Sequence, residues 1–259
     1  MTKLLPVFLS LAFLAGCQTA PRPVVPAAPA PPAAGADPFW PPGGVFSAPG
    51  HTSSWSGFRA KNVERRTLFA QRVGPDRGAI VFVGDSITEG WSTLEKDFAG
   101  LPVPVANRGI GGDTTPNLLY RLEEDVLSLH PRALVVLIGT NDLGEHTSPE
   151  DIAANLREFH QRVRAALPGI PIAWCLVMPR KGDDTYPERI HALNELIRGI
   201  AGSDPRITLC DTFTPLAQAD GSSRPEDFVP DRLHLNPAGY AVWRSALEPI
   251  LAGWSLGGK

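Results

Sequence analysis

Several features that would commit the chain to a particular class of protein are missing from its sequence. It has only three cysteines among 259 residues, which excludes a disulfide-stapled scaffold. No apolar run reaches the ~18 residues that a membrane-spanning helix requires. The formal net charge is −3 and Lys and Arg form no cluster, which argues against nucleic acid as a partner. No group of His, Cys and carboxylate residues has metal-ligand spacing, so we expect no metal and no other cofactor.

The N-terminus has the pattern of an export signal. A single charge at Lys3 precedes an apolar stretch from Leu4 to Leu14, which is followed by Ala15-Gly16-Cys17. The end of this stretch resembles a bacterial lipobox, in which residues 1–16 are removed and the cysteine is lipidated. The alternative is a plain secretory signal whose cysteine is incidental. We therefore expect an exported lipoprotein, held at a membrane of the cell envelope through Cys17.

Residues 17–50 are dominated by Pro and Ala, a composition that favours extended polyproline II geometry and cannot build a core. We interpret them as a tether; a Pro-rich ligand for a partner domain is the alternative. Residues 51–259 are long enough to bury a core without a metal or a disulfide. We expect the chain to begin packing onto this domain near four aromatic residues: Phe39, Trp40, Phe46 and Trp55.

The remaining chain alternates between strand and helix patterns. Five apolar runs are rich in Val, Ile and Leu without alternation, as in strands that are covered on both faces. This order predicts an α/β fold, a three-layer αβα sandwich with a five-stranded parallel sheet. The expected strands are 79–83, 103–106, 133–138, 172–177 and 206–209, and the expected helices are 115–129, 149–167, 187–200 and 237–252.

Cys175 and Cys210 fall in two of the expected strands. An exported protein permits a disulfide, but neighbouring strands rarely provide its geometry. We interpret the two residues as buried free thiols.

Polar residues suited to nucleophilic catalysis follow several of these strands. Ser86 comes directly after the first strand, and Asp231 and His234 lie beyond the fifth. Ligands of parallel sheets bind at the carboxyl ends of the strands, so these residues should meet there. His234 can accept the hydroxyl proton of Ser86 while Asp231 holds its other ring nitrogen. An isolated Asp-x-x-His pair is more often structural, and its combination with Ser86 favours catalysis.

Attack on an ester creates an oxyanion that needs hydrogen-bond donors. The candidates are the backbone N–H groups of Ser86 and Gly112 and the side-chain amide of Asn141. Turn formation is the alternative for Gly112, and loop bracing for Asn141. Ile87, Trp91 and Leu233 flank the catalytic candidates and could line the acyl pocket, with ordinary packing as the alternative. Three acidic residues are interpreted as loop-bracing acceptors: Asp85, Asp113 and Asp142.

Two rival motifs do not fit. Gly109-Ile110-Gly111-Gly112 lacks the G-x-G-x-x-G spacing of a dinucleotide-binding loop. Thr88 stands where the nucleophile elbow of α/β-hydrolases requires a second glycine. Both classes are therefore disfavoured.

Four blocks of the sequence resemble the SGNH (GDSL-type) hydrolases, over about residues 60–251. The similarity is greatest to the subgroup that contains platelet-activating-factor acetylhydrolase catalytic subunits and bacterial GDSL-type esterases. The resemblance implies a flavodoxin-like fold, with Ser86 as nucleophile, His234 as base and Asp231 as its orienting partner. Ile87 replaces the leucine of the family name. The blocks are Gly84-Asp85-Ser86-Ile87, Gly112, Gly139-Thr140-Asn141-Asp142 and Asp231-x-x-His234, and the subgroup similarity lies in 82–86, 109–115 and 178–180.

We therefore expect an esterase that hydrolyses small acyl esters, acetyl groups on carbohydrate above all. The polar loops 180–186 and 212–230 should reach a hydrophilic alcohol portion. The alternatives are a lysophospholipase or longer-chain lipase, and a catalytically silent glycan-binding lipoprotein of the envelope. The presence of Ser86, Asp231, His234 and Asn141 argues against the silent protein, because binding alone does not require all four.

Overall fold

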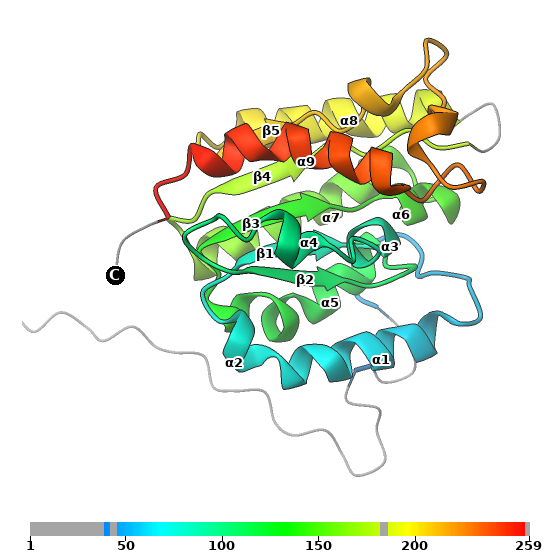
Figure 1. The fold of residues 1–259 in the computed structure, drawn as a ribbon. Coiled ribbons are helices and arrows are strands. Elements are labelled where there is room, and N and C mark those ends of the chain that lie inside the picture. Colours follow the sequence, from blue (N-terminus) through cyan, green and yellow to red (C-terminus); the bar gives the residue numbers. More distant parts are fainter. Residues whose placement is uncertain (1–38, 42–45, 182–185, 257–259) are drawn as a thin grey trace, which may run out of the picture. The chain divides into compact units, whose positions relative to one another are not determined.

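The protein is described here from a computed structural model, which covers residues 39–41, 46–181 and 186–256. The expected signal at 1–16, the lipidation residue Cys17 and most of the tether lie outside the described residues. Five parallel strands form one sheet in the order β2-β1-β3-β4-β5 (Figure 1). The strands are β1 (Ile80–Gly84), β2 (Val105–Gly109), β3 (Ala133–Leu137), β4 (Ile172–Cys175) and β5 (Ile207–Cys210).

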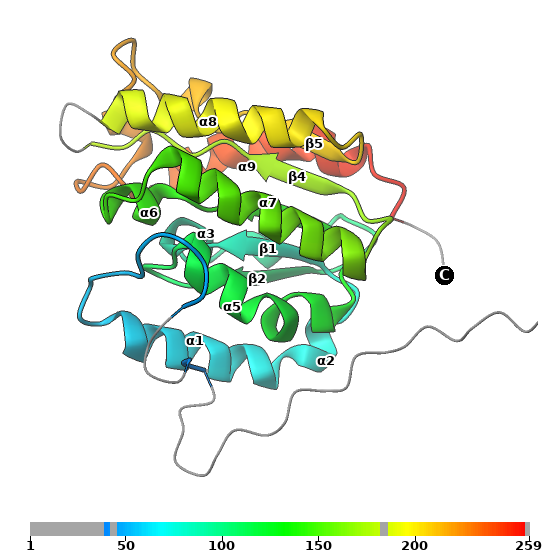
Figure 2. The same ribbon diagram turned by 180° about the vertical axis from the view of Figure 1, so that it is seen from behind.

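Helices connect the strands and cover both faces of the sheet (Figures 1 and 2). The longer ones are α1 (Phe58–Gln71), α5 (Thr115–Asp125), α7 (Pro149–Ala166), α8 (Tyr186–Gly202) and α9 (Pro237–Ala252). Short helices are α2 (Val73–Asp76), α3 (Ser86–Glu89), α4 (Leu94–Asp97) and α6 (Thr140–Gly144), with 3₁₀ turns η2 (Leu127–Leu129), η3 (Thr214–Leu216) and η4 (Pro225–Asp227). The expected three-layer α/β fold with a parallel sheet is confirmed.

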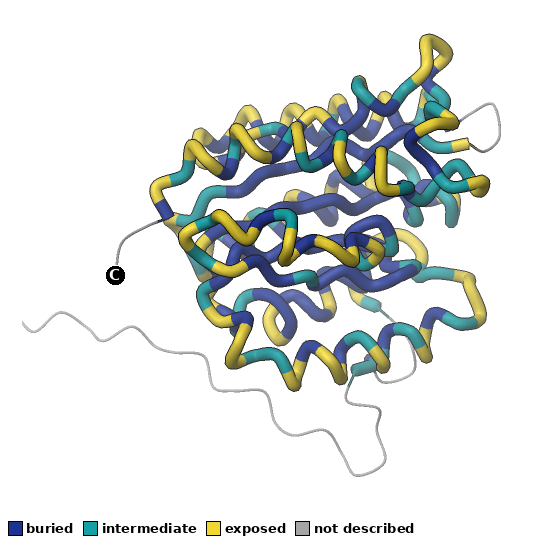
Figure 3. Tube along the Cα trace, in the orientation of Figure 1, coloured by how far each residue is buried: buried dark blue, intermediate teal, exposed yellow. Residues whose placement is uncertain are grey.

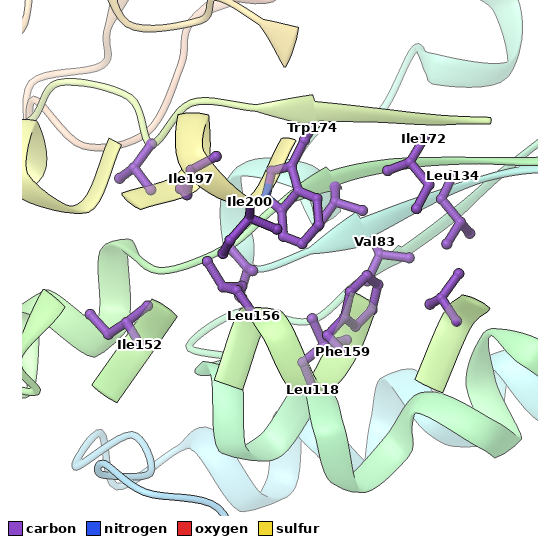
Figure 4. Packing of buried hydrophobic residues seen from close by; sticks show 14 of the residues in the cluster. Val83, Leu118, Leu134, Ile152, Leu156, Phe159, Ile172, Trp174, Ile197 and Ile200 are labelled. Atoms are coloured by element: carbon purple, nitrogen blue, oxygen red, sulfur yellow. The ribbon is translucent and has the colours of Figure 1, made fainter. Parts of the chain in front are cut away.

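Alternate residues of the central strands supply two separate hydrophobic layers. Val81 and Val83 of β1 pack with α5, α7 and α8, while Ile80 and Phe82 pack with α3, α4 and α9. Figure 4 shows the first layer, in which Phe159 of α7 meets Trp174 of β4 with ring centroids 5.9 Å apart. Strands β1, β3 and β4 are buried throughout, and the helices alternate between buried and exposed residues (Figure 3). Burial on both faces explains why these strands show no alternation in sequence.

Strand β2 begins two residues later than expected and continues through polar Asn107 and Arg108. The Arg108 guanidinium is buried, pairs with Asp76 at 2.8 Å and lies 4.7 Å from the ring centroid of Phe69. A carboxylate partner makes a charged residue tolerable inside the sheet, and a search for apolar runs could not indicate this strand position. The expected helix 115–129 is divided into α5 and η2, because Val126 leaves helical geometry.

The chain packs onto the domain through Phe39, Trp40 and Phe46, as expected, and thus before residue 51, where the domain was expected to begin. The Trp40 ring lies against Phe46 and Phe58, at centroid distances of 5.3 and 5.8 Å. The guanidinium of Arg66, on α1, lies 4.8 Å from the centroid of the Phe39 ring. The described residues, from Phe39 onward, belong to one compact unit.

Cys175 and Cys210 are buried, free and directly opposite each other on β4 and β5, as expected. None of the helices in the described part of the chain is long and apolar enough to cross a membrane.

Candidate active site

The turn after β1 places Ser86 at the start of α3. A Cβ atom at Gly84 would lie 2.3 Å from the carbonyl oxygen of Leu137, so only glycine fits there. The carboxylate of Asp85 accepts a hydrogen bond from the backbone N–H of Ile87 at 2.9 Å and caps the helix. The half-buried Ser86 side chain is thereby fixed at the carboxyl edge of the sheet. Asn141 follows the adjacent β3, so both residues lie where the strand order reverses direction.

The loop before α9 brings a histidine to this serine. His234 Nε2 lies 2.8 Å from Ser86 Oγ, and His234 Nδ1 lies 2.6 Å from Asp231 Oδ2. The other carboxylate oxygen of Asp231 accepts from the backbone N–H groups of Leu233 and His234, both at 2.9 Å. Arg232 adopts a left-handed φ of 59°, which closes this turn so that Asp231 and His234 face each other.

Hydrogen bonding keeps Asp231 ionised. Partial burial raises the pKa of its carboxyl, but the hydrogen bonds from the His234 ring and from the two backbone N–H groups outweigh it. The net effect is a pKa below the usual 3.8. A carboxylate in this position fixes the Nδ1–H tautomer, which leaves Nε2 free to accept the Ser86 proton.

Two candidate oxyanion donors lie beside Ser86. Gly112 has a φ of +82°, and a Cβ there would lie 2.9 Å from the Phe58 ring. One N–H of the Asn141 amide donates to the carbonyl of Asp113 at 2.9 Å, and an amide has a second N–H to offer. Both residues line the same cleft as Ser86. Backbone geometry thus holds the amide of Asn141 and the glycine loop in fixed positions.

Three buried aspartates brace the loops around these residues, as expected. Burial raises the pKa of Asp85 and of Asp142 to about 7, and that of Asp113 to about 6. Asp142 accepts from the backbone N–H and hydroxyl of Thr115, at 2.9 and 2.5 Å. The guanidinium of Arg121 pairs with Asp113 at 2.8 Å and also donates to the backbone at the ends of β1 and β2.

The cleft above these residues has a volume of about 780 Å³. Besides Ser86, Gly112, Asn141, Leu233 and His234, its walls contain polar and aromatic groups that no sequence motif indicated. Of the expected loop 180–186, Arg180 and Tyr186, the first residue of α8, line the cleft, whereas residues 212–230 contribute nothing to the lining. The polar and aromatic lining residues that no motif indicated are Ser53, Ser54, Trp55, Lys61, Glu89, Ser92 and Glu145.

The structure corrects the expected pocket role of Ile87 and Trp91. Each side chain is only 2% exposed, and neither lines the cleft. Trp91 packs in an aromatic cluster against Trp243 and Tyr240, with centroids 4.7 and 5.4 Å away. Because α3 covers one face of the sheet, the side chain that follows Ser86 points into the core. Both residues therefore support the helix that carries Ser86.

Taken together, the arrangement can deprotonate a serine hydroxyl beside hydrogen-bond donors in an open cleft. Across the described ranges, no three His, Cys, Asp or Glu side chains gather in a way that could hold a metal ion. The five strands are parallel, and Ser86, Asn141 and His234 line one cleft at their carboxyl edge.

Comparison with known proteins identifies the family of the chain. The sequence model of the GDSL-like lipase/acylhydrolase family matches residues 82–242. The alpha1 subunit of platelet-activating factor acetylhydrolase IB from Pongo abelii is 33% identical over 181 residues, which cover 66% of this chain and 74% of the relative. The chain belongs to the GDSL-like lipase/acylhydrolase family, and it is a hydrolase that acts on ester bonds.

Solved structures share the fold. A GDSL-like lipase from Bacteroides thetaiotaomicron superimposes with a TM-score of 0.60 at 25% identity, over 75% of this chain and 97% of that one. An acetylxylan esterase from Geobacillus stearothermophilus gives a TM-score of 0.56 at 22% identity, over 70% and 97%. The expected family is confirmed, and with it the flavodoxin-like strand order.

Proposed function

We propose that the protein is a serine esterase in which Ser86 is the nucleophile, His234 the general base and Asp231 the residue that orients His234. The observation that carries this proposal is the continuous pair of hydrogen bonds, 2.8 Å from Ser86 to His234 and 2.6 Å from His234 to Asp231. His234 takes the hydroxyl proton as Ser86 attacks the ester carbonyl, and then gives it to the departing alcohol. Water repeats the sequence and releases the acid.

The oxyanion formed in each step is stabilised by three donors. They are the backbone N–H groups of Ser86 and Gly112 and the free N–H of Asn141. The half-buried position of Ser86 and the brace between Asn141 and Asp113 support this assignment, because preorganised donors need no rearrangement during the reaction.

The proposed substrates are small acyl esters, acetyl esters of carbohydrate above all. The cleft lining includes several polar and charged side chains, and these can pair with the hydroxyls of a sugar alcohol portion. The branched side chain of Leu233 beside His234 can restrict the acyl portion. Two similar proteins, an acetylhydrolase subunit and an acetylxylan esterase, point the same way.

A panel of p-nitrophenyl esters from acetate to palmitate tests this proposal. We expect kcat/KM to fall at least ~tenfold from the acetyl to the hexanoyl ester, because each excluded methylene group is discriminated against. A rise in kcat/KM toward the octanoyl ester would instead indicate the longer-chain lipase. The absence of turnover of any ester would indicate the catalytically silent lipoprotein. Ser86→Ala should lose turnover by up to ~10⁶-fold while staying folded. Retention of more than about a tenth of the activity would reject Ser86 as nucleophile.

We also propose that the enzyme acts in the cell envelope, anchored through a lipid on Cys17. The support is the lipobox-like sequence that ends at this cysteine and the Pro- and Ala-rich stretch after it.

A further inference from the structure

We propose that the exposed ring of Trp55 is a platform on which the alcohol portion of the substrate stacks, and that this portion is a pyranose ring. The inference rests on the proposed esterase function and adds to it a binding subsite for the sugar. It starts from a segment that lies outside the family-matched residues 82–242 and yet forms one wall of the cleft.

This segment, residues 46–57, is fastened to helices that follow β3 (Figure 2). The carbonyl of Pro49 accepts from the Asn155 amide at 2.8 Å, and the backbone N–H of His51 donates to Thr147 Oγ1 at 3.2 Å. Both the backbone N–H and the hydroxyl of Ser54 donate to Glu145, at 2.7 and 2.9 Å. Hydrogen bonds to three separate residues of α7 and of the turn between α6 and α7 therefore hold this segment in place as one wall of the cleft.

The Trp55 ring is held in this wall but is not covered. The residue is 52% exposed, more than any other large hydrophobic residue in the described part of the chain. One side of the ring faces the glycine loop, since a Cβ at Gly112 would lie 3.4 Å from Trp55 Cε3. Gly57 lies against another part of the ring, where a Cβ would come within 2.5 Å of Trp55 Cζ2. Glycines at both contacts allow the ring to lie close to the backbone beside the candidate oxyanion donors.

The surroundings of the ring select a hydrophilic ligand. Glu145, Lys61 and Arg180 line the cleft around it, with the hydroxyls of Ser53 and Ser54. A pyranose has faces of C–H groups that pack on an aromatic ring and a rim of hydroxyls that pair with polar side chains. An acyl chain would remove these charged groups from water and offer them no hydrogen bonds in exchange, at a cost in free energy. A flat aromatic ring beside charged groups and hydroxyls therefore fits a sugar.

The test compares two acetyl esters that differ only in the alcohol portion, acetylated xylotriose and ethyl acetate. For Trp55→Ala we expect kcat/KM on the sugar ester to fall about tenfold or more, mainly through KM, because a stacking surface is lost. Hydrolysis of ethyl acetate should change less than about twofold, since it has no ring to stack. Trp55→Tyr should restore most of the activity on the sugar ester. Leu68→Ala is the matched control. It also removes an exposed hydrophobic side chain, but Leu68 lies on α1 and does not line the cleft.

Three results would overturn the inference, and each differs from failure of the esterase proposal. Equal losses on both esters for Trp55→Ala would mean that the ring only supports the glycine loop. Unchanged kinetics on both would mean that the ring has no role in binding. Wild-type protein that hydrolyses ethyl acetate but not the sugar ester would exclude the pyranose while leaving the esterase intact. Wild-type protein that hydrolyses neither ester would reject the proposed acetylesterase function itself.

Discussion

At the scale of single residues, Glu89 connects the nucleophile to the glycine loop. It is the last residue of α3, and its Oε2 accepts the backbone N–H of Gly111 at 2.5 Å. Its Oε1 lies 3.5 Å from the Lys61 ammonium and 3.8 Å from the Arg65 guanidinium. By fixing the peptide at Gly111, the carboxylate of Glu89 also helps to set the direction of the next backbone N–H, that of Gly112. We interpret Glu89 as a positioning residue for the oxyanion donors.

Glu89→Ala should lower kcat by about tenfold with KM little changed, because a misplaced donor weakens only the transition state. Glu89→Gln keeps an oxygen that can accept the Gly111 N–H, so it should recover most of this loss. Steady-state kinetics on an acetyl ester measure both variants. Glu64→Gln, which changes an exposed partner of the same Lys61, is the control. A larger effect in KM than in kcat for Glu89→Ala would show that Glu89 binds substrate.

Residues that belong to a motif could be predicted, and isolated ones could not. Ser86, Asp231 and His234 stand at fixed spacings after strand-like runs, so the topology of a parallel sheet was enough to bring them together. Glu89 and Trp55 have no such spacing. Their roles depend on where the glycine loop and the segment 46–57 fold back, and contacts of this kind are not encoded in local patterns.

At the scale of elements, α9 supports the short helix that carries the nucleophile. The hydroxyl of Tyr240 donates to the carbonyl of Ile87 at 2.9 Å. Burial raises the pKa of this hydroxyl well above its usual 10, so it remains a donor at all moderate pH values. The packing of Tyr240 on Trp91 fixes α3 from the same side.

Tyr240→Phe should destabilise the protein by ~1–2 kcal/mol, because it removes a hydrogen bond and leaves the Ile87 carbonyl without this donor. Thermal unfolding would measure the loss, and kcat should fall only a few-fold because the packing is kept. Ser245→Ala, which removes an exposed hydroxyl from the same helix, serves as the control. No change in the melting temperature for Tyr240→Phe would mean that aromatic packing alone holds α3.

Asp142 couples α6 to the start of α5 and makes stability depend on pH. Its pKa of about 7 is above the ordinary 3.8, so between about pH 4 and 7 the folded state keeps a proton that the unfolded state has released. The stabilisation is therefore complete at acid pH and declines as the pH rises to about 7.

Asp142→Asn removes this titration, so we expect its melting temperature to decline less than that of the wild type as the pH rises over this window. Differential scanning calorimetry at several pH values provides the comparison, and Glu158→Gln on the exposed side of α7 controls for the loss of one surface charge. An unchanged pH slope in Asp142→Asn would show that Asp85 and Asp113 dominate the titration.

The long elements were predictable because their patterns are periodic. Helix α9 was expected at its observed bounds, and Ser148 caps α7 as predicted, with Asp151 donating its N–H to the serine hydroxyl. Helix α1 was not expected, since its buried face includes Asn62 and Arg66 in place of a continuous apolar stripe. Arg66 is satisfied by ion pairs with Glu124 and Asp125, which lie far away in sequence.

At the scale of the whole molecule, the anchor remains a prediction. In a Gram-negative host, wild-type protein should partition with membranes and incorporate a labelled fatty acid. Cys17→Ser should do neither, because the serine cannot be lipidated. Cys210→Ser is the control for loss of a cysteine elsewhere in the chain. Equal labelling of wild type and Cys17→Ser would reject lipidation at this position.

The two cysteines that face each other on β4 and β5 affect how the chain behaves under oxidising conditions. Burial raises the pKa of Cys175 far above its usual value, and Cys210 is 1% exposed, so the folded sheet holds little reactive thiolate. Unfolding removes this protection from both thiols at once. Oxidants should therefore leave the native protein unchanged but trap unfolded chains as cross-linked species. The sheet that positions the active site thus also determines whether thermal inactivation is reversible.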